Sequence, residues 1–309
     1  MSSESKKNID LSVGLGRITL KNPVLVASGT FGYGEECAEL INLNELGGIM
    51  VKAVTLEPRE GNPPPRLAET PAGLLNAIGL ENPGVDVFLK EKLPFLRGFQ
   101  TAIIVNIAGE KEEEYLRLAE RLNQVKGISA LEVNISCPNV KEKGLIFGTD
   151  PEQTFSLVKK LGEITDIPLI VKLTPNVTDI TKIAQASQEA GAEALSLINT
   201  VLGMSIDVET RKPKLGNITG GLSGPAIRPI AVRMMWQTFQ KVNLPLIGMG
   251  GITDAEDALE FILAGASAVA IGTANFIDPK TALEVIEGIK QYMQVKGIKN
   301  FKDLIGWLK

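Results

Sequence analysis

The chain alternates between short apolar runs and longer amphipathic stretches over most of its length. The short runs contain few polar residues, as expected for parallel strands that are buried on both faces. The stretches between them repeat apolar residues three and four positions apart, which is the period of a helix. The predicted strands are Val24–Ser28, Gly48–Ala53, Ala102–Ile107, Leu131–Ile135, Leu169–Leu173, Ala194–Ile198, Leu246–Met249 and Ala268–Ile271. The predicted helices are Glu35–Leu43, Glu112–Gln124, Pro151–Glu163, Ile180–Ala190, Ala226–Gln240, Ala255–Ala264 and Lys280–Val295.

Helix start signals support this assignment. Asp150-Pro151, Asp254 and Asp278-Pro279 stand just before helical patterns, where a capping carboxylate and a first-turn proline are favoured. Strands that alternate with helices in this way indicate the α/β class, and we expect one (β/α)8 TIM-barrel domain over residues 1–309. A doubly wound open sheet is the alternative. It is disfavoured because no glycine-rich dinucleotide fingerprint follows the first strand.

Two connections are longer than a barrel requires. The segment after the second strand runs from Thr55 to Pro83, and a further long connection follows the sixth strand. Connections of this length are usually functional or disordered. The apolar pairs and triplets within the first one, such as Leu74-Leu75, argue against disorder. We therefore expect an ordered wall or lid there.

Polar residues and glycines end nearly every predicted strand, at the side where a barrel places its chemistry. Part of this pattern has a simple explanation, because a buried strand ends where polar residues begin. That explanation does not account for two lysines at a barrel mouth, where each needs an anionic or hydrogen-bonding partner. The residues at the strand ends are Ser28, Lys52, Asn106, Asn134 with Cys137, Lys172, Asn199-Thr200, Gly250-Gly251 and Gly272-Thr273.

Glycine clusters follow the last two predicted strands. Barrels commonly bind a phosphate between these loops through bare backbone N–H groups. The run Gly220-Gly221-Leu222-Ser223-Gly224 adds a third set of potential donors. Each cluster alone is compatible with an ordinary turn, but together they favour a ligand that carries a phosphate.

The stretch from Ala130 to Gly148 passes from a buried strand into a polar turn that contains Cys137. A lone cysteine is often a small buried hydrophobe. Here polar residues flank it, and Pro138 disfavours helix at the cysteine itself. The chain contains no histidine, so a base that works near neutral pH must be Cys, Lys, a carboxylate or a cofactor. Cys137 is the best candidate.

The composition restricts the class of function. Of 309 residues, 44% are apolar and 22% are charged, with a formal net charge of -4. The sequence contains no block of basic residues of the kind that binds nucleic acid, so we expect no nucleic-acid partner. Cys37 and Cys137 cannot form a disulfide framework and lack the spacing of a metal or iron–sulfur site. No signal peptide or membrane-spanning run is apparent, so we expect a cytoplasmic protein and no membrane partner.

Several motifs at these strand ends resemble the dihydroorotate dehydrogenases, FMN-dependent barrel enzymes of pyrimidine synthesis, from Leu11 to about Tyr292. The match is closest to the catalytic subunit of class 1, type B. The resemblance rests on Val51-Lys52-Ala53 with GNPPPR, Asn76-Ala77-Ile78-Gly79-Leu80, the NISCPN loop, Lys172, Ile198-Asn199-Thr200, GGLSG, GMGGI and IGTA.

The resemblance implies a role for each matching residue, with Cys137, Lys52 and Lys172 as the catalytic groups and no metal site. Cys137 would remove the C5 proton of dihydroorotate while hydride passes from C6 to FMN. FMN would contact Ser28, Lys52, Ala53, Asn106, Asn134, Lys172, Ile198, Gly224, Gly250, Gly251, Gly272 and Thr273. The pyrimidine would contact Lys52, Asn76, Ala77, Ile78, Gly79, Leu80, Asn134, Asn199 and Thr200.

The type B resemblance also implies a partner. Electrons would pass to NAD through an electron-transfer subunit that carries FAD and a [2Fe–2S] cluster, in a heterotetramer with two copies of each chain. Three alternatives stay open at this point. They are a dihydropyrimidine dehydrogenase-like FMN barrel, a fumarate-linked type A dihydroorotate dehydrogenase, and a non-redox barrel that binds a phosphorylated metabolite.

We predict that Cys137→Ala abolishes dihydroorotate oxidation but leaves FMN bound, because loss of a general base typically costs ~10²–10⁴ in rate. Cys137→Ser should keep some activity, with its optimum at higher pH, because a hydroxyl is a far weaker acid than a thiol. The matched control is Cys37→Ala, since Cys37 lies in a helical pattern. Steady-state rates and flavin absorbance of the three variants provide the measurement, and turnover of Cys137→Ala within about tenfold of wild type would contradict the assignment.

Overall fold

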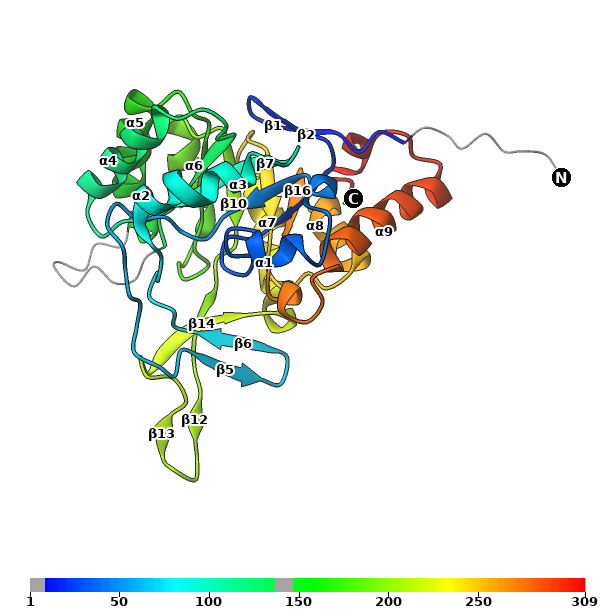
Figure 1. Cartoon of the computed structure of the whole chain (residues 1–309). Helices are drawn as coiled ribbons and strands as arrows, with labels where there is room; N and C mark the ends of the chain where they lie inside the picture. Colours follow the sequence, from blue (N-terminus) through cyan, green and yellow to red (C-terminus); the bar gives the residue numbers. More distant parts are fainter. Residues whose placement is uncertain (1–8, 137–146, 309) are drawn as a thin grey trace.

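The computed structural model describes residues 9–136 and 147–308. Within them, parallel strands close into a barrel with helices outside it (Figure 1), in the ring order β10-β15-β16-β3-β4-β7-β8-β9. The predicted (β/α)8 TIM barrel is therefore confirmed. The strands are β3 (Val24–Val26), β4 (Gly48–Met50), β7 (Ala102–Ile107), β8 (Ala130–Asn134), β9 (Leu169–Lys172), β10 (Ala194–Leu197), β15 (Leu246–Gly248) and β16 (Ala268–Ile271).

The outer helices follow the predicted pattern closely, and their caps explain where they begin. The side chain of Asp150 accepts a hydrogen bond from the backbone N–H of Gln153, and Asp254 does the same for Asp257. These bonds satisfy N–H groups that the helix itself leaves unpaired. The helices are α4 (Glu112–Asn123), α5 (Pro151–Ile164), α6 (Ile180–Glu189), α7 (Arg228–Phe239), α8 (Ala255–Leu263) and α9 (Thr281–Lys296).

The first predicted helix is wrong beyond its first turn. α1 covers only Glu35–Ala38, and the chain then forms a separate 3-10 turn at Leu43–Glu45. Asn42 starts this turn by accepting a hydrogen bond from the N–H of Asn44. An Asn side chain that bonds to nearby backbone competes with a continuing helix, so the helical pattern breaks there.

Several shorter elements connect these layers. An interrupted helix runs from residue 84 to residue 96, between the long loop and β7, and was not predicted. It is made of α2 (Gly84–Val87), a π-helical turn (Phe88–Lys92) and α3 (Leu93–Leu96). The remaining 3-10 turns are Phe147–Thr149, Pro225–Ile227, Thr273–Phe276 and Phe301–Leu304.

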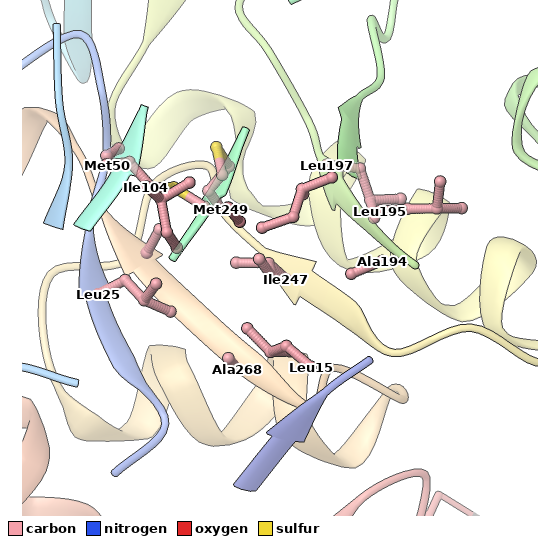
Figure 2. Close-up of a cluster of buried hydrophobic side chains, with 14 of the residues drawn as sticks. Leu15, Leu25, Met50, Ile104, Ala194, Leu195, Leu197, Ile247, Met249 and Ala268 are labelled. Atoms are coloured by element: carbon pink, nitrogen blue, oxygen red, sulfur yellow. The ribbon is translucent and has the colours of Figure 1, made fainter. Parts of the chain in front are cut away.

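Apolar side chains fill the barrel at the end where its strands begin. Figure 2 shows Leu25, Ile104 and Ile247 converging from different strands, with Leu15 beside Ala268. Leu15 belongs to a hairpin, β1 (Val13–Leu15) with β2 (Ile18–Leu20). Arg17, at its turn, forms an ion pair of 2.6 Å with Glu193, the residue before β10. The hairpin therefore covers the end of the barrel where the strands begin.

A second sheet stands beside the other end of the barrel. Within the described residues its order is β11-β14-β6-β5, and all its pairings are antiparallel. The strands are β5 (Leu67–Thr70), β6 (Gly73–Asn76), β11 (Val201–Met204) and β14 (Thr219–Ser223), with a separate hairpin of β12 (Ile206–Asp207) and β13 (Lys212–Pro213).

This sheet joins the two long connections, and Figure 1 shows it extending away from the barrel together with the β12–β13 hairpin. β5 and β6 belong to the connection after β4, whereas β11 and β14 follow β10. The predicted ordered wall is confirmed. Its strands were not predicted, because glycine-rich segments such as Thr219–Ser223 lack the alternation of a typical strand.

No helix in the described residues is long and apolar enough to cross a membrane.

We predict that Gly47→Ala destabilises the barrel. A Cβ on Gly47 would lie 2.2 Å from the backbone oxygen of Asn22 and 2.9 Å from that of Val24, and backbone moves less readily than a side chain. We expect the free energy of unfolding to fall by about 1–3 kcal/mol. The matched control is Gly162→Ala in α5, where no heavy atom lies within 4 Å of the added Cβ. It should raise stability by roughly 0.5–1 kcal/mol. Urea titrations of both variants measure the difference, and equal effects would contradict the packing described here.

Candidate active site at the barrel mouth

Polar side chains from four neighbouring strands lie at two adjoining levels of the barrel, near the ends of those strands. In the strand register, Asn106 of β7 stands beside Glu132 of β8. One step nearer the mouth, Lys172 of β9 stands beside Asn134 of β8 and Ser196 of β10. The sequence folds this way because inward-facing positions alternate along each strand. A polar layer therefore lies above the apolar core.

Lys172 is buried and spans the barrel. Its Nζ lies 3.1 Å from Ser28 Oγ and 3.5 Å from Glu132 Oε2. Ser28 follows β3, which is on the opposite side of the strand ring from β9. The relative exposure of Lys172 is 6% and that of Glu132 is 0%. We expect each lysine in the mouth to have an anionic or hydrogen-bonding partner. For Lys172 that partner is the carboxylate of Glu132 on the adjacent strand.

Lys52 has a different environment. Its side chain is 33% exposed, and its Nζ lies 3.9 Å from Glu81 Oε2. The backbone N–H of Lys52 donates to the carbonyl oxygen of Gly32 at 2.8 Å. Lys52 thus sits beside the end of the segment Asn76–Leu80, as the predicted shared role in substrate binding requires. Its side chain is partly exposed and its ion pair with Glu81 is long, so the ammonium group can also contact a ligand.

The wall segment Asn76–Leu80 is held in place by the long loop itself. Asn62 donates from Nδ2 to the carbonyl oxygen of Ala77 at 3.0 Å and from its backbone N–H to that of Ile78 at 2.9 Å. Gly79 has φ +77, and a Cβ there would lie 2.6 Å from the backbone N of Asn62. A glycine is therefore required for this close approach.

Amide side chains lie at the ends of barrel strands and on the wall. Asn199 Nδ2 donates to Asn134 Oδ1 at 3.3 Å, and Asn199 Oδ1 accepts from the backbone N–H of Thr200 at 2.8 Å. Asn76 Nδ2 donates to the carbonyl oxygen of Gly221 at 3.1 Å. Amides offer both donors and acceptors, so such a set can bracket a planar polar ligand.

The glycine loops meet at the mouth. Gly224 and Gly251 are packed together, since a Cβ on Gly251 would lie 2.7 Å from the carbonyl oxygen of Gly224. Thr273 Oγ1 donates to Ser223 Oγ at 2.8 Å, which ties the second sheet to the loop after β16. Within the described part of the chain, the N–H groups of Gly250, Gly251 and Gly272 make no backbone hydrogen bond. These donors are free for a phosphate.

The remaining residues expected at a cofactor lie on the same side of the barrel. Ala53 follows Lys52 beside β7, where the next residue, Val54, bonds to the carbonyl oxygen of Asn106. Ile198 follows β10, and its N–H donates to the carbonyl oxygen of Met249 at 3.0 Å. Both positions follow the ends of barrel strands, and a Cβ on Gly250 would lie 3.5 Å from Ile198 Cγ1.

A flavin mononucleotide fits this donor set. Within the described residues, Asn106 Oδ1 is buried without a hydrogen-bond partner, although buried polar atoms are normally paired. An imide N–H of a flavin ring would supply the missing donor. Lys172 offers a positive charge, and the glycine N–H groups suit a phosphate. The chain therefore has a group for the imide N–H, for a negative charge on the ring and for the phosphate of such a cofactor.

The structure describes one of the two cysteines, Cys37. Cys137 lies outside the described residues, so its role stays a prediction. Cys37 lies in α1, as predicted, and is half-buried. Burial, and next the nearby Glu36 carboxylate, raise the pKa of the Cys37 thiol, which makes it a poor thiolate source near neutral pH.

Sequence reasoning missed two residues of the polar layer. Glu132 accepts hydrogen bonds from Ser196 Oγ at 2.7 Å and from Asn106 Nδ2. Glu132 and Ser196 are both fully buried. The available signal was a glutamate in the middle of an apolar strand, where an unpaired charge is costly.

The comparisons with known proteins agree with this geometry. The family model described as dihydroorotate dehydrogenase matches residues 10–293. A protein of Desulforudis audaxviator named "Dihydroorotate dehydrogenase B (NAD(+)), catalytic subunit" is 58% identical over 96% of this chain and 97% of its own length. A protein of the same name from Thermoanaerobacter pseudethanolicus is 53% identical over 97% and 99%.

A solved structure shares the fold. The structure titled "Crystal structure of DHODH in complex with ferulenol from Eimeria tenella" superposes with a TM-score of 0.81, covering 99% of this chain and 90% of that one, at 23% sequence identity. At this identity the likeness concerns the fold alone. The family model and the relatives at 53–58% identity establish the family: the chain belongs to the dihydroorotate dehydrogenases.

Proposed function

We propose that this chain is the catalytic subunit of an NAD-linked dihydroorotate dehydrogenase, which oxidises dihydroorotate to orotate with FMN bound at the barrel mouth. One observation carries the proposal: the buried Lys172, the amides of Asn134 and Asn199, and the free glycine N–H groups converge on one mouth. Relatives at 53–58% identity over nearly the whole chain bear this name.

The residues divide into two groups by position. We assign those on the barrel strands and the glycine loops to the cofactor, namely Ser28, Asn106 and Lys172 with Gly250, Gly251 and Gly272; the bonds from Lys172 to Ser28 and from Asn106 to Glu132 support this. We assign Lys52, Asn76–Leu80 and Asn199 to the substrate, which the contact of Lys52 with Glu81 and the bond from Asn199 to Asn134 support. Lys52 supplies positive charge for the carboxylate of dihydroorotate, a group that uracil lacks.

Bound FMN supplies the acceptor for the hydride that leaves C6 of dihydroorotate. Cys137 takes the proton from C5, beside the ring carbonyl, as the general base. The amides of Asn134 and Asn199 fix the plane of the substrate ring through paired donors and acceptors. Lys172 stabilises negative charge at the cofactor in a site sheltered from water.

The relatives are named as catalytic subunits, and we infer a partner for this chain as well. The described residues contain no cluster of Cys, His, Asp or Glu that could hold a metal. The two cysteines of the sequence are also too few for a [2Fe–2S] site. We therefore place FAD and the [2Fe–2S] cluster on an electron-transfer subunit, in a heterotetramer with two copies of each chain.

We predict different effects for the two lysines. Lys52→Ala should raise the KM for dihydroorotate by roughly 10–100-fold, because a hydrogen bond to a charged group contributes about 1.5–3 kcal/mol. It should also weaken FMN binding. Lys172→Ala should weaken FMN and slow its reduction by roughly 10²–10³-fold. Stopped-flow bleaching of the flavin and flavin titration measure both.

The control for the lysines is Lys160→Ala, whose side chain pairs with Glu112 on the outer face of the barrel at 2.7 Å. It should leave both constants unchanged. If either Lys52→Ala or Lys172→Ala reduced the flavin at the wild-type rate with the same dihydroorotate affinity, the role given to that lysine would be wrong.

We predict that the isolated chain bleaches its FMN with dihydroorotate but does not reduce NAD until the electron-transfer subunit is added. The proposal assigns the free N–H groups of the glycine loops to the phosphate of FMN, and the sequence shows no dinucleotide fingerprint for NAD. Assays with dihydroorotate or dihydrouracil as donor, and NAD, fumarate or a quinone as acceptor, test this. Rapid NAD reduction by the isolated chain would refute the need for a partner. Efficient fumarate turnover would move the assignment to type A, and a preference for dihydrouracil would indicate a dihydropyrimidine dehydrogenase.

A further inference from the structure

The barrel strands contain two charged residues in the described chain, and these two face each other. They are Glu132 and Lys172, 3.5 Å apart between Oε2 and Nζ. The other barrel strands read VLV, GIM, AIIVNI, ALSL, LIG and AVAI and supply no titratable side chain. The charge on Lys172 therefore has one counter-charge within the barrel.

Glu132 is itself fixed on both carboxylate oxygens. Oε1 accepts from Ser196 Oγ at 2.7 Å, and Oε2 accepts from Asn106 Nδ2 as well as from Lys172 Nζ. These donors come from three strands around β8. With 0% exposure, the carboxylate has no water to replace a lost partner, so its position and that of Lys172 depend on each other.

We propose that Glu132 is a positioning residue for the flavin chemistry: its buried carboxylate holds the Lys172 ammonium across the barrel, and it orients the Asn106 amide. This inference rests on the proposed function, because it takes FMN as the group that the ammonium faces. Glu132 touches neither substrate nor cofactor in this account. It acts through Lys172 and Asn106.

The other groups that face the ammonium cannot replace this carboxylate. Ser28 contributes a neutral hydroxyl from the loop after β3, and Ser196 stands beside Lys172 on β10. Lys52 at the end of β4 is directed to Glu81 instead. A lysine left in this place without Glu132 favours its neutral form, because desolvation disfavours the charged one.

The test is the midpoint potential of bound FMN against pH, from about pH 6 to pH 9, in the purified chain. In Glu132→Gln, flavin reduction should take up one more proton than in wild type, because Lys172 is neutral beside oxidised flavin and gains a proton when the flavin becomes anionic. The potential should therefore fall more steeply with pH. A merely structural role for Glu132 would not change this slope.

Three variants locate the proton. Glu132→Asp keeps the charge and should restore the wild-type slope. Ser196→Ala removes one hydrogen bond to Glu132 but no charge, and should also keep it. Adding Lys172→Met to Glu132→Gln should remove the extra proton. A wild-type slope in Glu132→Gln, or an extra proton that persists without Lys172, would overturn the proposal.

A second measurement needs no flavin, in case Glu132→Gln does not retain it. Lys172→Met leaves an unpaired carboxylate inside the barrel, and removing one partner of a buried ion pair is strongly destabilising. Its thermal unfolding temperature at pH 7 should therefore fall below that of wild type. Adding Glu132→Gln should recover part of the loss, and equal unfolding temperatures in the two variants would overturn the coupling. A wild-type chain that binds no flavin would instead refute the proposed function, while this stability comparison would still report on the ion pair.

Discussion

The buried pair of Lys172 and Glu132 is the constraint on which the mouth end of this barrel depends, where the strands end. Taking two charges out of water is costly, and the attraction between them compensates only when hydrogen bonds satisfy the rest of each group. Here Ser28, Ser196 and Asn106 provide those bonds from three further positions around the ring. Losing either charge of the pair is therefore costly, because breaking a buried ion pair by removing one partner typically costs about 3–5 kcal/mol.

The need to pair these buried charges also explains two other parts of the structure. They are the apolar layers between the polar layer and the start of the strands, and the second sheet beside the mouth. The hairpin around Leu15 packs apolar side chains against the end of the barrel where the strands begin. On the side of the mouth, the second sheet is attached by Ser223 to Thr273 and by Gly224 to Gly251. Within the described residues, Asn106 Oδ1 is a buried atom of the polar layer that has no hydrogen-bond partner, and a ligand at the mouth could supply one.

The repeating part of the fold was predictable from sequence, and the irregular part was not. Buried parallel strands such as Ala268–Ile271 have an unbroken apolar pattern, and the predicted bounds agree with the structure residue for residue. The segments Gly73–Asn76 and Thr219–Ser223 pair with each other although 142 residues separate their ends, and neither shows a strand pattern alone. Likewise, the lysine at the end of β9 was visible as an anomaly. Its partner Glu132 was identified only when the strand register placed the two side chains together.

The division of the site between two scaffolds has a chemical consequence. Glu132 and Lys172 stand on barrel strands, where close packing fixes their positions. The segment Asn76–Leu80 belongs to the long loop, where Asn62 fixes the backbone around Gly79 and the neighbouring Lys52 stays partly exposed. A substitution in the loop can therefore change the rim of the site without changing the charge balance between Lys172 and Glu132. A substitution in the polar layer of the barrel changes that balance directly, because each of its charges is paired with the other.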